Sequence, residues 1–475
     1  MLTASCLTAC SNENGKHSTN STGTAPAVSE TETIDPRATL DTPELDFEGY
    51  VFRVLYIDDP LLFTTFDVDG YNSDPVNDAI YDRNRIIEDK LHITFESQTT
   101  SIANAPSALS KQVQSGLTGP DAYDLIMQIC RDAYSLTLQN LLCDYNRLEY
   151  VDTDKDYYFN EVNKQFSIGG RLFFAFGADS LNILALSNCM MFNKKMATEH
   201  SIPDLYGEVN NKEWTYDHLF SYCNEVAEDL NGDGSYTLGT DIMGLVGRED
   251  YSIPAAWISA GESLISKNED DMPYYSALGD GRMTTIMQEA ITFFSSGICS
   301  CYNGSTPYQT FAENKAFMMC GGITHLGNIR DMQDDYGVIP WPMYDRQQGQ
   351  YYTRLTDGWL NCVPTDCPNT ERTSAVLQAL AYYSYHTVYD AYYKLALSAK
   401  YVRDPESVDM IKLILSNVTV DLGDTVWYAD MRGSITQTLA GANGASKVAS
   451  TLKRQEGIAD TRIKKVAEFL SKNQA

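Results

Sequence analysis

The chain has 475 residues, of which 43% are hydrophobic and 21% charged, and its net charge is −29 because 64 acidic side chains outnumber 35 basic ones. This apolar fraction excludes a wholly disordered chain, and the negative field repels phosphate backbones, which argues against nucleic-acid binding. No run approaches the roughly 18 apolar residues that a spanning helix needs, so the sequence predicts no transmembrane segment. At about 150 residues per domain, the length predicts two or three domains.

The N-terminal residues have the pattern of a targeting signal, and we do not expect them to be part of the folded domain. Leu7-Thr8-Ala9-Cys10 resembles a bacterial lipobox, in which small residues let a signal peptidase cut before a cysteine that then carries lipid. Neither a basic residue nor an apolar stretch as long as that of a secretory signal precedes Cys10, so we interpret 1–10 as a truncated lipoprotein signal. The alternative is a chance cysteine in a flexible tail. Residues 11–45 are rich in Ser, Thr, Asn, Glu, Gly and Pro, which predicts a flexible tether.

The next stretch alternates strand patterns with helix patterns. Apolar residues at helical spacing predict a helix over 74–91, capped by Asp74 or Asn77. A second helix is expected near 105–117, and strands are expected at 50–56, 92–96 and 123–128. This order requires right-handed crossovers between parallel strands, so the sequence predicts an α/β fold with mostly parallel sheets flanked by helices.

The remainder of the chain continues in the same style. Longer helices broken by loops are expected from 194 to 316. Further strands are expected at 172–178, 184–193, 316–322, 336–340 and 358–364, and further helices at 369–384, 388–399, 404–416 and 450–473.

The cysteines do not form a metal or disulfide pattern. Setting aside Cys6 and Cys10 leaves nine of the 11, an odd number, and none has C-x-x-C spacing with histidine partners. We expect most of them to be buried free thiols, although one pair could be bridged.

Several segments occur in an order that resembles a known family. They are the lipobox, the tether, Val76–Asn84, Phe192–Lys195, Trp214–Asp217, Asp229–Gly234, Phe311–Ala316 and Val363-Pro364. Over about residues 46–470 they resemble the extracellular solute-binding proteins of ABC importers, in the carbohydrate-type family that includes maltose-binding protein.

The resemblance implies a clamshell of two discontinuous lobes that close on a ligand by hinge motion. Lobe one would take 46–185 plus 317–357, and lobe two 186–316 plus 358–475, with hinges near 186–193 and 358–364. It further implies a monomeric, non-enzymatic receptor that is lipid-anchored at the outer face of the bacterial cytoplasmic membrane. Such a receptor captures a sugar or oligosaccharide and delivers it to ABC permease subunits.

Candidate ligand residues follow from where strands end, because ligands in open α/β sheets lie beyond the carboxyl ends of the strands. Asp58 follows the first strand, Arg131 the third, and Asp179 the strand expected at 172–178. Carboxylate and guanidinium groups suit sugar hydroxyls, so each is a candidate ligand contact. The alternative in each case is a solvated loop charge.

Aromatic candidates could stack on the apolar faces of a sugar. Trp427 lies in a segment that resembles the tryptophan-bearing, sugar-stacking segment of maltose-binding proteins, and Trp359 follows Gly358 where a hinge is expected. The resemblance also places Tyr251, Trp257 and His325 at the cleft, although the family's tryptophan is missing near His325. The alternative is that these side chains belong to the core.

An acidic loop resembles the first half of a calcium-binding loop. Asp229, Asn231 and Asp233 alternate ahead of glycines, but the twelfth position is Thr240 and Asp241 comes one residue late. The sequence therefore predicts either a structural Ca²⁺ site or an Asx-rich turn without metal, and no other cofactor.

Two other functions compete with a sugar receptor. A hidden pair of carboxylates could make the protein an envelope glycoside-cleaving enzyme, and the same fold could bind peptides or another solute. Nucleophile-elbow, P-loop and zincin motifs are absent from the sequence.

Overall fold

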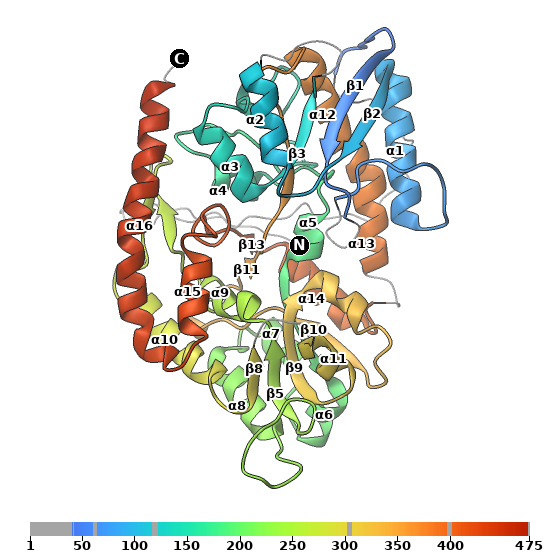
Figure 1. The fold of residues 1–475 in the computed structure, drawn as a ribbon. Helices are drawn as coiled ribbons and strands as arrows, with labels where there is room; N and C mark the ends of the chain where they lie inside the picture. Colours follow the sequence, from blue (N-terminus) through green and yellow to red (C-terminus); the bar gives the residue numbers. More distant parts are fainter. Residues whose placement is uncertain are drawn as a thin grey trace, which may run out of the picture.

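The computed structural model describes residues 40, 42–59, 64–115, 122–301, 306–396 and 401–473, which form two α/β lobes (Figure 1). Cys10, the signal at 1–10, most of the tether and the predicted helix ends at 116–117 and 397–399 lie outside these residues. Within the described part of the chain, no helix has both the length and the apolar character needed to cross a membrane.

The first lobe is built on a four-stranded sheet in the order β12-β3-β1-β2. Its strands are β1 (Tyr50–Tyr56), β2 (Ile93–Thr99), β3 (Leu125–Ile129) and β12 (Trp359–Cys362). The first three run parallel, as the alternating pattern predicts, and β12 is antiparallel to β3.

The first long helix shows how local sequence sets an element. Helix α1 (Pro75–Leu91) begins at Asp74, whose carboxylate accepts hydrogen bonds from the Val76 and Asn77 backbone N–H groups. Its buried face packs on α12 (Thr370–Ser384) and on the π-helical turn η4 (Tyr385–Tyr389). Helix α2 (Ala105–Ser115) packs on β3 and on α3 (Cys130–Leu138).

The second lobe is built on a five-stranded sheet in the order β10-β4-β9-β5-β8. Its strands are β4 (Asn188–Asn193), β5 (Met243–Gly247), β8 (Cys299–Cys301), β9 (Ala316–Gly322) and β10 (Tyr336–Ile339). Strand β5 is parallel to β8 and β9, whereas β4 is antiparallel to β9 and β10. This sheet is mixed, so the expectation of a mostly parallel sheet is confirmed for the first lobe only.

The remaining elements connect or cover the two sheets. The other strands are β6 (Ile265–Lys267), β7 (Pro273–Tyr275), β11 (Thr353–Arg354) and β13 (Val418–Thr419). The other helices are α4 (Asn160–Phe166), α5 (Asn182–Leu186), α6 (Lys194–Glu199), α7 (Leu205–Asn210), α8 (Tyr216–Val226), α9 (Glu249–Ser259), α10 (Arg282–Phe294), α11 (Thr306–Ala312), α13 (Asp390–Ala396), α14 (Pro405–Leu415), α15 (Arg432–Leu439) and α16 (Gly444–Lys472). Short 3₁₀ turns are η1 (Tyr145–Arg147), η2 (Ile323–Asn328) and η3 (Arg346–Gln348).

The predicted division of the chain between the lobes is wrong for its later segments. All but the first residue of β9, and the whole of β10, lie within 317–357, which was expected in lobe one. In the structure β9 pairs with β4 and β5, and β10 pairs with β4, in the second sheet. Strand β12 and helix α12 lie within 358–475, expected in lobe two, but β12 pairs with β3 and α12 packs on α1 in the first lobe. Each sheet buries its apolar face by recruiting strands distant in sequence, which periodicity does not reveal.

Two connections between the lobes, within the described residues, lie beside one another. Ser187, just before β4, forms an antiparallel bridge with Leu355, just before β12. Thr356 Oγ1 donates to Asn188 Oδ1 at 2.8 Å and so joins the two crossings. The crossings fall at 186–188 and 355–358, at the edge of the predicted hinge regions; residues 359–362 belong to the first sheet.

A buried ion pair holds the crossing in place. Arg354 in β11 donates to both carboxylate oxygens of Asp424, at 2.6 and 2.9 Å, and the two side chains are only 1% and 0% exposed. Two parallel N–H···O bonds fix the orientation as well as the distance, so this pair ties the C-terminal segment to the crossing.

Two predicted strands take another form. Residues 172–178 make only isolated bridges, Tyr158–Gly177 and Ala175–Asn361, because no neighbouring strand continues the ladder there. Residues 182–186 form helix α5, so only 188–193 of the predicted strand at 184–193 pairs in a sheet.

Candidate functional site

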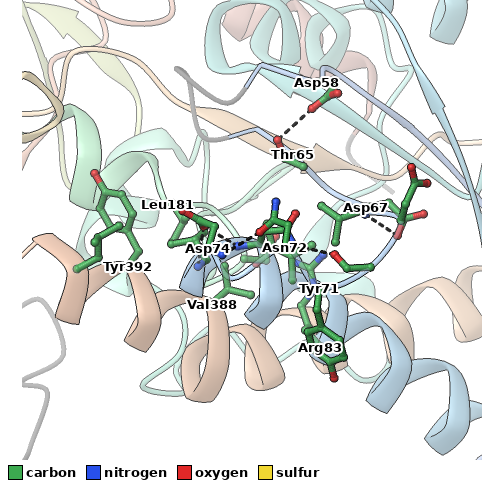
Figure 2. Close-up of a pocket in the computed structure, with 18 of the residues that line it drawn as sticks. Asp58, Thr65, Asp67, Tyr71, Asn72, Asp74, Arg83, Leu181, Val388 and Tyr392 are labelled. Atoms are coloured by element: carbon green, nitrogen blue, oxygen red, sulfur yellow. Dashed lines mark hydrogen bonds between the residues drawn. The ribbon is translucent and has the colours of Figure 1, made fainter. Parts of the chain in front are cut away.

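A cavity of about 910 Å³ opens on the first lobe (Figure 2). Its wall comes from the segment between β1 and α1, from α1 itself, from the segment before α5, and from η4 and α13. Tyr401 completes the wall, and its carbonyl accepts a hydrogen bond from the Tyr336 hydroxyl of β10 in the second lobe. Tyr401 therefore joins the rim of this first-lobe cavity to the second lobe.

The lining is acidic and aromatic. Its carboxylates belong to Asp58, Asp67, Asp69, Asp74 and Asp179, and its rings to Tyr71, Tyr392 and Tyr401. Carboxylates that can accept several hydroxyl hydrogens, together with flat rings, match the hydroxyls and apolar faces of a sugar. Two of the sequence candidates, Asp58 and Asp179, are in this set.

Asp58 stands on the upper wall in Figure 2. It follows the last strand residue of β1 by two positions, and its Oδ1 accepts a hydrogen bond from Thr65 Oγ1 at 3.0 Å. The side chain is otherwise exposed, so its second oxygen is open to a ligand.

Asp179 lies deeper in the cavity. Its Oδ2 accepts from Asn361 Nδ2 at 2.6 Å, and burial raises the pKa of its carboxyl group even though Arg83 favours the charged form. A side chain at position 177 would collide with Asp179 Oδ1, so glycine at 177 allows this carboxylate to fold back over the chain.

Arg83 is the cation of the cavity, and sequence reasoning missed it as a site residue. Its guanidinium is 2% exposed and donates to the Phe66 carbonyl at 2.6 Å and to Asn84 Oδ1 at 3.0 Å. Burial lowers its pKa to about 10, and Asp179 and Asp67 oppose the fall. The available signal was an arginine on the apolar stripe of α1, between Ile80 and Ile87.

A small recess of about 10 Å³ adjoins the cavity and shares Thr65, Arg83 and Asp179 with it. Trp359, the third sequence candidate on this side, lines the recess at the first position of β12. Its neighbour Gly358 lets the backbone pass the Phe176 ring, with which any side chain at 358 would collide.

Two candidates meet in the second lobe. The rings of Tyr251 and His325 lie edge to face, 5.2 Å apart, and His325 also stacks on Tyr308 at 4.3 Å. His325 Nδ1 accepts the Gly322 N–H at 2.8 Å, and burial lowers its pKa to about 4, so this imidazole is neutral. Burial likewise raises the pKa of Tyr251 to about 12.

Arg131 belongs to a third group, at the start of α3. Its guanidinium lies 5.6 Å from the Tyr428 ring, over which Arg432 lies at 4.1 Å. Arg432 also pairs with Asp357 at 3.6 Å. Arg131 is therefore near the crossing between the lobes, but it does not line the cavity.

The two remaining candidate tryptophans, Trp257 and Trp427, are buried. Trp257 is 0% exposed and its Nε1 donates to Asp421 Oδ2 at 3.0 Å, so the structure contradicts a ligand contact there: the ring is core and its polar atom is satisfied. Trp427 is 4% exposed and packs edge to face on Tyr134. Stacking of sugar on Trp427 stays a prediction, which this position does not favour.

The acidic loop is folded on its own backbone. Asp229 accepts from the Gly232 and Gly234 N–H groups, and Asp241 from those of Leu230 and Thr237. Within the described ranges no group of three or more His, Cys, Asp or Glu residues could hold a metal ion. The carboxylates thus form the Asx-type turns of the metal-free alternative, and calcium binding by Asp229, Asn231, Asp233 and Asp241 stays a prediction.

The cysteine expectation can be compared with nine described residues. Cys130, Cys189, Cys223, Cys320 and Cys362 are buried free thiols, and the other four are free and partly buried. Burial is thus confirmed for five of these nine, and the absence of a disulfide stays a prediction.

Comparison with family models and with curated proteins gave no match. Solved structures do match. M. tuberculosis UspC is 15% identical with a TM-score of 0.57, covering 87% of this chain and 100% of that one. A cyclo/maltodextrin-binding protein in complex with maltotetraose is 14% identical with a TM-score of 0.56, covering 88% and 97%. An ABC substrate-binding protein from Listeria monocytogenes in complex with cycloalternan is 11% identical with a TM-score of 0.54, covering 88% and 99%.

The chain shares its fold with these three structures, one of which is an ABC substrate-binding protein. Matches over almost the whole length of each neighbour confirm the predicted two-lobed α/β class. At these identities the likeness concerns the fold, and the ligands belong to the neighbours.

Proposed function

We propose that the protein is the substrate-binding component of an ABC importer and that it binds a sugar or oligosaccharide in the cavity between β1, α1 and α13. The observation that carries this proposal is the lining: five aspartates and three tyrosines surround about 910 Å³ on a fold whose neighbours include structures with maltotetraose and cycloalternan. Sugar sites combine such acceptors with aromatic faces.

The cellular setting follows from the same proposal. A receptor of this kind works outside the cytoplasmic membrane, where it hands its ligand to permease subunits as a monomer. The lipobox-like sequence before Cys10 supports a lipid anchor on the outer face of that membrane, with 11–45 as the tether.

Binding without chemistry is favoured over catalysis. The cyclo/maltodextrin-binding protein and the Listeria monocytogenes substrate-binding protein, which share this fold, are binding proteins. An enzyme that cleaves glycosides would need one carboxylic acid and one carboxylate across the bond. Of the cavity carboxylates, Asp67 accepts from Asn84 and Ser97, and Asp74 caps α1, so both have structural roles.

The test is a binding screen by titration calorimetry. The panel holds maltotriose, maltotetraose, cycloalternan, monosaccharides and short peptides. We expect at least one sugar to bind and to be recovered unchanged. Binding of peptides alone would support the peptide-receptor alternative, and recovery of a cleaved glycan would support the enzyme.

A matched pair of variants tests whether the ligand binds in this cavity. Asp58→Asn should weaken sugar binding about tenfold, because it removes a charge-assisted hydrogen bond. Asp89→Asn, on the exposed side of α1, should leave binding unchanged. If both variants bound sugar with the affinity of the wild type, the ligand would have to bind outside this cavity.

A further inference from the structure

Two residues that line the recess next to the cavity have polar side-chain atoms without a hydrogen-bond partner in the described part of the chain. Trp359 Nε1 and Asn361 Oδ1 are both buried, and neither has a hydrogen-bond partner among the described residues. A buried donor or acceptor without a partner costs about 1–3 kcal/mol, so two in one place call for an explanation.

The two atoms belong to the same side of one strand. Trp359 and Asn361 are two positions apart in β12, and alternate residues of a strand point to the same face. Both line the recess together with Asp179 and Arg83. A donor and an acceptor therefore share this wall.

The surroundings of the indole are rigid. The Trp359 backbone N–H donates to Asn182 Oδ1 at 2.8 Å, and its carbonyl accepts from Ser180 Oγ at 2.9 Å. Asn361 is held by its Nδ2, which donates to Asp179 Oδ2 at 2.6 Å. Because these atoms are already hydrogen-bonded, the indole N–H of Trp359 and the side-chain oxygen Oδ1 of Asn361 are left for a third group.

The size of the recess limits that group. A volume of about 10 Å³ has room for roughly one oxygen atom and excludes a sugar ring. A hydroxyl group has this size, and it both accepts and donates a hydrogen bond.

We propose that the recess binds one hydroxyl group of the carbohydrate. The indole N–H of Trp359 donates to the hydroxyl oxygen, and the hydroxyl in turn donates its hydrogen to Asn361 Oδ1. The inference rests on the proposed function and assigns Trp359 a polar role in specificity in place of the stacking expected from sequence. The ligand must then carry a free hydroxyl at the end that enters the recess.

The experiment combines one variant with deoxy sugars. Trp359→Phe keeps the ring but removes the N–H. For the best sugar of the panel, we expect it to weaken binding about tenfold. Wild-type protein should lose a similar factor for one monodeoxy analogue, and the variant should bind that analogue as well as it binds the parent sugar.

Trp341→Phe is the matched control. Trp341 Nε1 is also buried and without a partner in the described structure, but it lies in the second-lobe core, against Phe294. We expect this variant to bind sugar like the wild type. The ligand-free Tm of Trp359→Phe should fall by no more than that of Trp341→Phe, because in both variants an unpaired N–H is removed.

Three results would overturn the inference. The first is unchanged affinity of Trp359→Phe. The second is additive losses from variant and analogue, which would mean that the recess holds water and not the sugar hydroxyl. The third, readable on wild-type protein alone, is a deoxy series in which no single position costs tenfold. If no sugar binds the wild type, the proposed function fails and takes this inference with it.

Discussion

His325 is neutral because of where its side chain lies. Its ring is enclosed by Tyr251 and Tyr308, Arg248 is close enough to disfavour a positive charge, and its Nδ1 accepts a backbone N–H. Protonation would remove the acceptor and place a charge in a buried site, so this histidine couples the stability of the second lobe to pH.

We expect His325 to make the protein less stable in acid. Because the folded-state pKa is lowered from 6.5 to about 4, the unfolded chain takes up a proton first as the pH falls. The stabilising contribution is complete above pH 6.5 and is lost as the pH falls towards 4, by an amount on the order of 3 kcal/mol.

Urea denaturation from pH 7.5 to 4 of the wild type and of His325→Asn, which keeps a neutral acceptor, measures this. The advantage of the wild type should shrink across that interval. A constant difference between the two proteins would show that His325 does not titrate as the structure indicates.

The candidate residues were predictable where strand ends and chemistry agree. Asp58 was nominated from the loop after β1, and it lines the cavity. Asp179 also lines the cavity, although residues 172–178, after which it was nominated, make only isolated bridges. Trp257 could not be separated from core tryptophans, because its partner Asp421 is 164 positions away in the sequence. Arg83 was overlooked because a charge on a helix is usually solvated, and burial on α1 appears only once α12 covers it.

At the scale of elements, α1 links stability to the cavity. Its N-cap Asp74 satisfies two backbone N–H groups and also lines the cavity, so the helix start and the cavity wall depend on one carboxylate. The macrodipole of a 17-residue helix favours this negative charge.

Asp74→Ala should therefore lower the free energy of unfolding by about 1 kcal/mol, as loss of an N-cap usually does. Asp74→Ser, which keeps a capping oxygen, should retain most of that stability. Chemical denaturation of both variants measures the difference, and equal losses for alanine and serine would exclude capping as the cause.

The elements predicted best were those with a strong local period. The helix at 74–91 and the strands at 50–56 and 316–322 have the expected positions within a residue or two. Strands β5 and β8 were missed, since they are only five and three residues long; β5 pairs with β9 and β8, and β8 pairs with β5. Residues 172–178 have the composition of a strand but make only isolated bridges, to Tyr158 and to Asn361 of β12.

At the scale of the molecule, the chain passes repeatedly between two lobes, and this sets the expected motion. The crossings at 186–188 and 355–358 lie side by side, joined by the Ser187–Leu355 bridge and by Thr356. Two adjacent backbone segments form a natural axis about which lobes can rotate.

We expect the sugar that binds best to close the lobes. Small-angle X-ray scattering should show a smaller radius of gyration when this sugar is added than in the free protein, because a ligand held between lobes favours the closed state. A non-binding sugar at the same concentration is the control. An unchanged radius at saturating ligand would mean that binding occurs within one lobe without closure.

The overall fold was predictable, but the allocation of segments to lobes was not. The order of strands and helices predicts an α/β protein, and the family resemblance implies two lobes. The partner with which a strand pairs depends on contacts across more than a hundred residues. Strand β12 illustrates this, because it joins β3 of the first sheet from a position 230 residues later in the chain, Trp359 beside Ile129.

Helix α16 runs along one side of both lobes (Figure 1). It packs on α10 of the second lobe and on α3 of the first, and Arg171 of the first lobe donates to the carbonyl of Asn473 just beyond its end. Because α16 contacts both lobes, we expect it to allow rotation of one lobe against the other but to oppose their separation along its own side. We therefore expect the lobes to open on the side opposite α16, the side that carries α1 and α13, and the ligand to enter there.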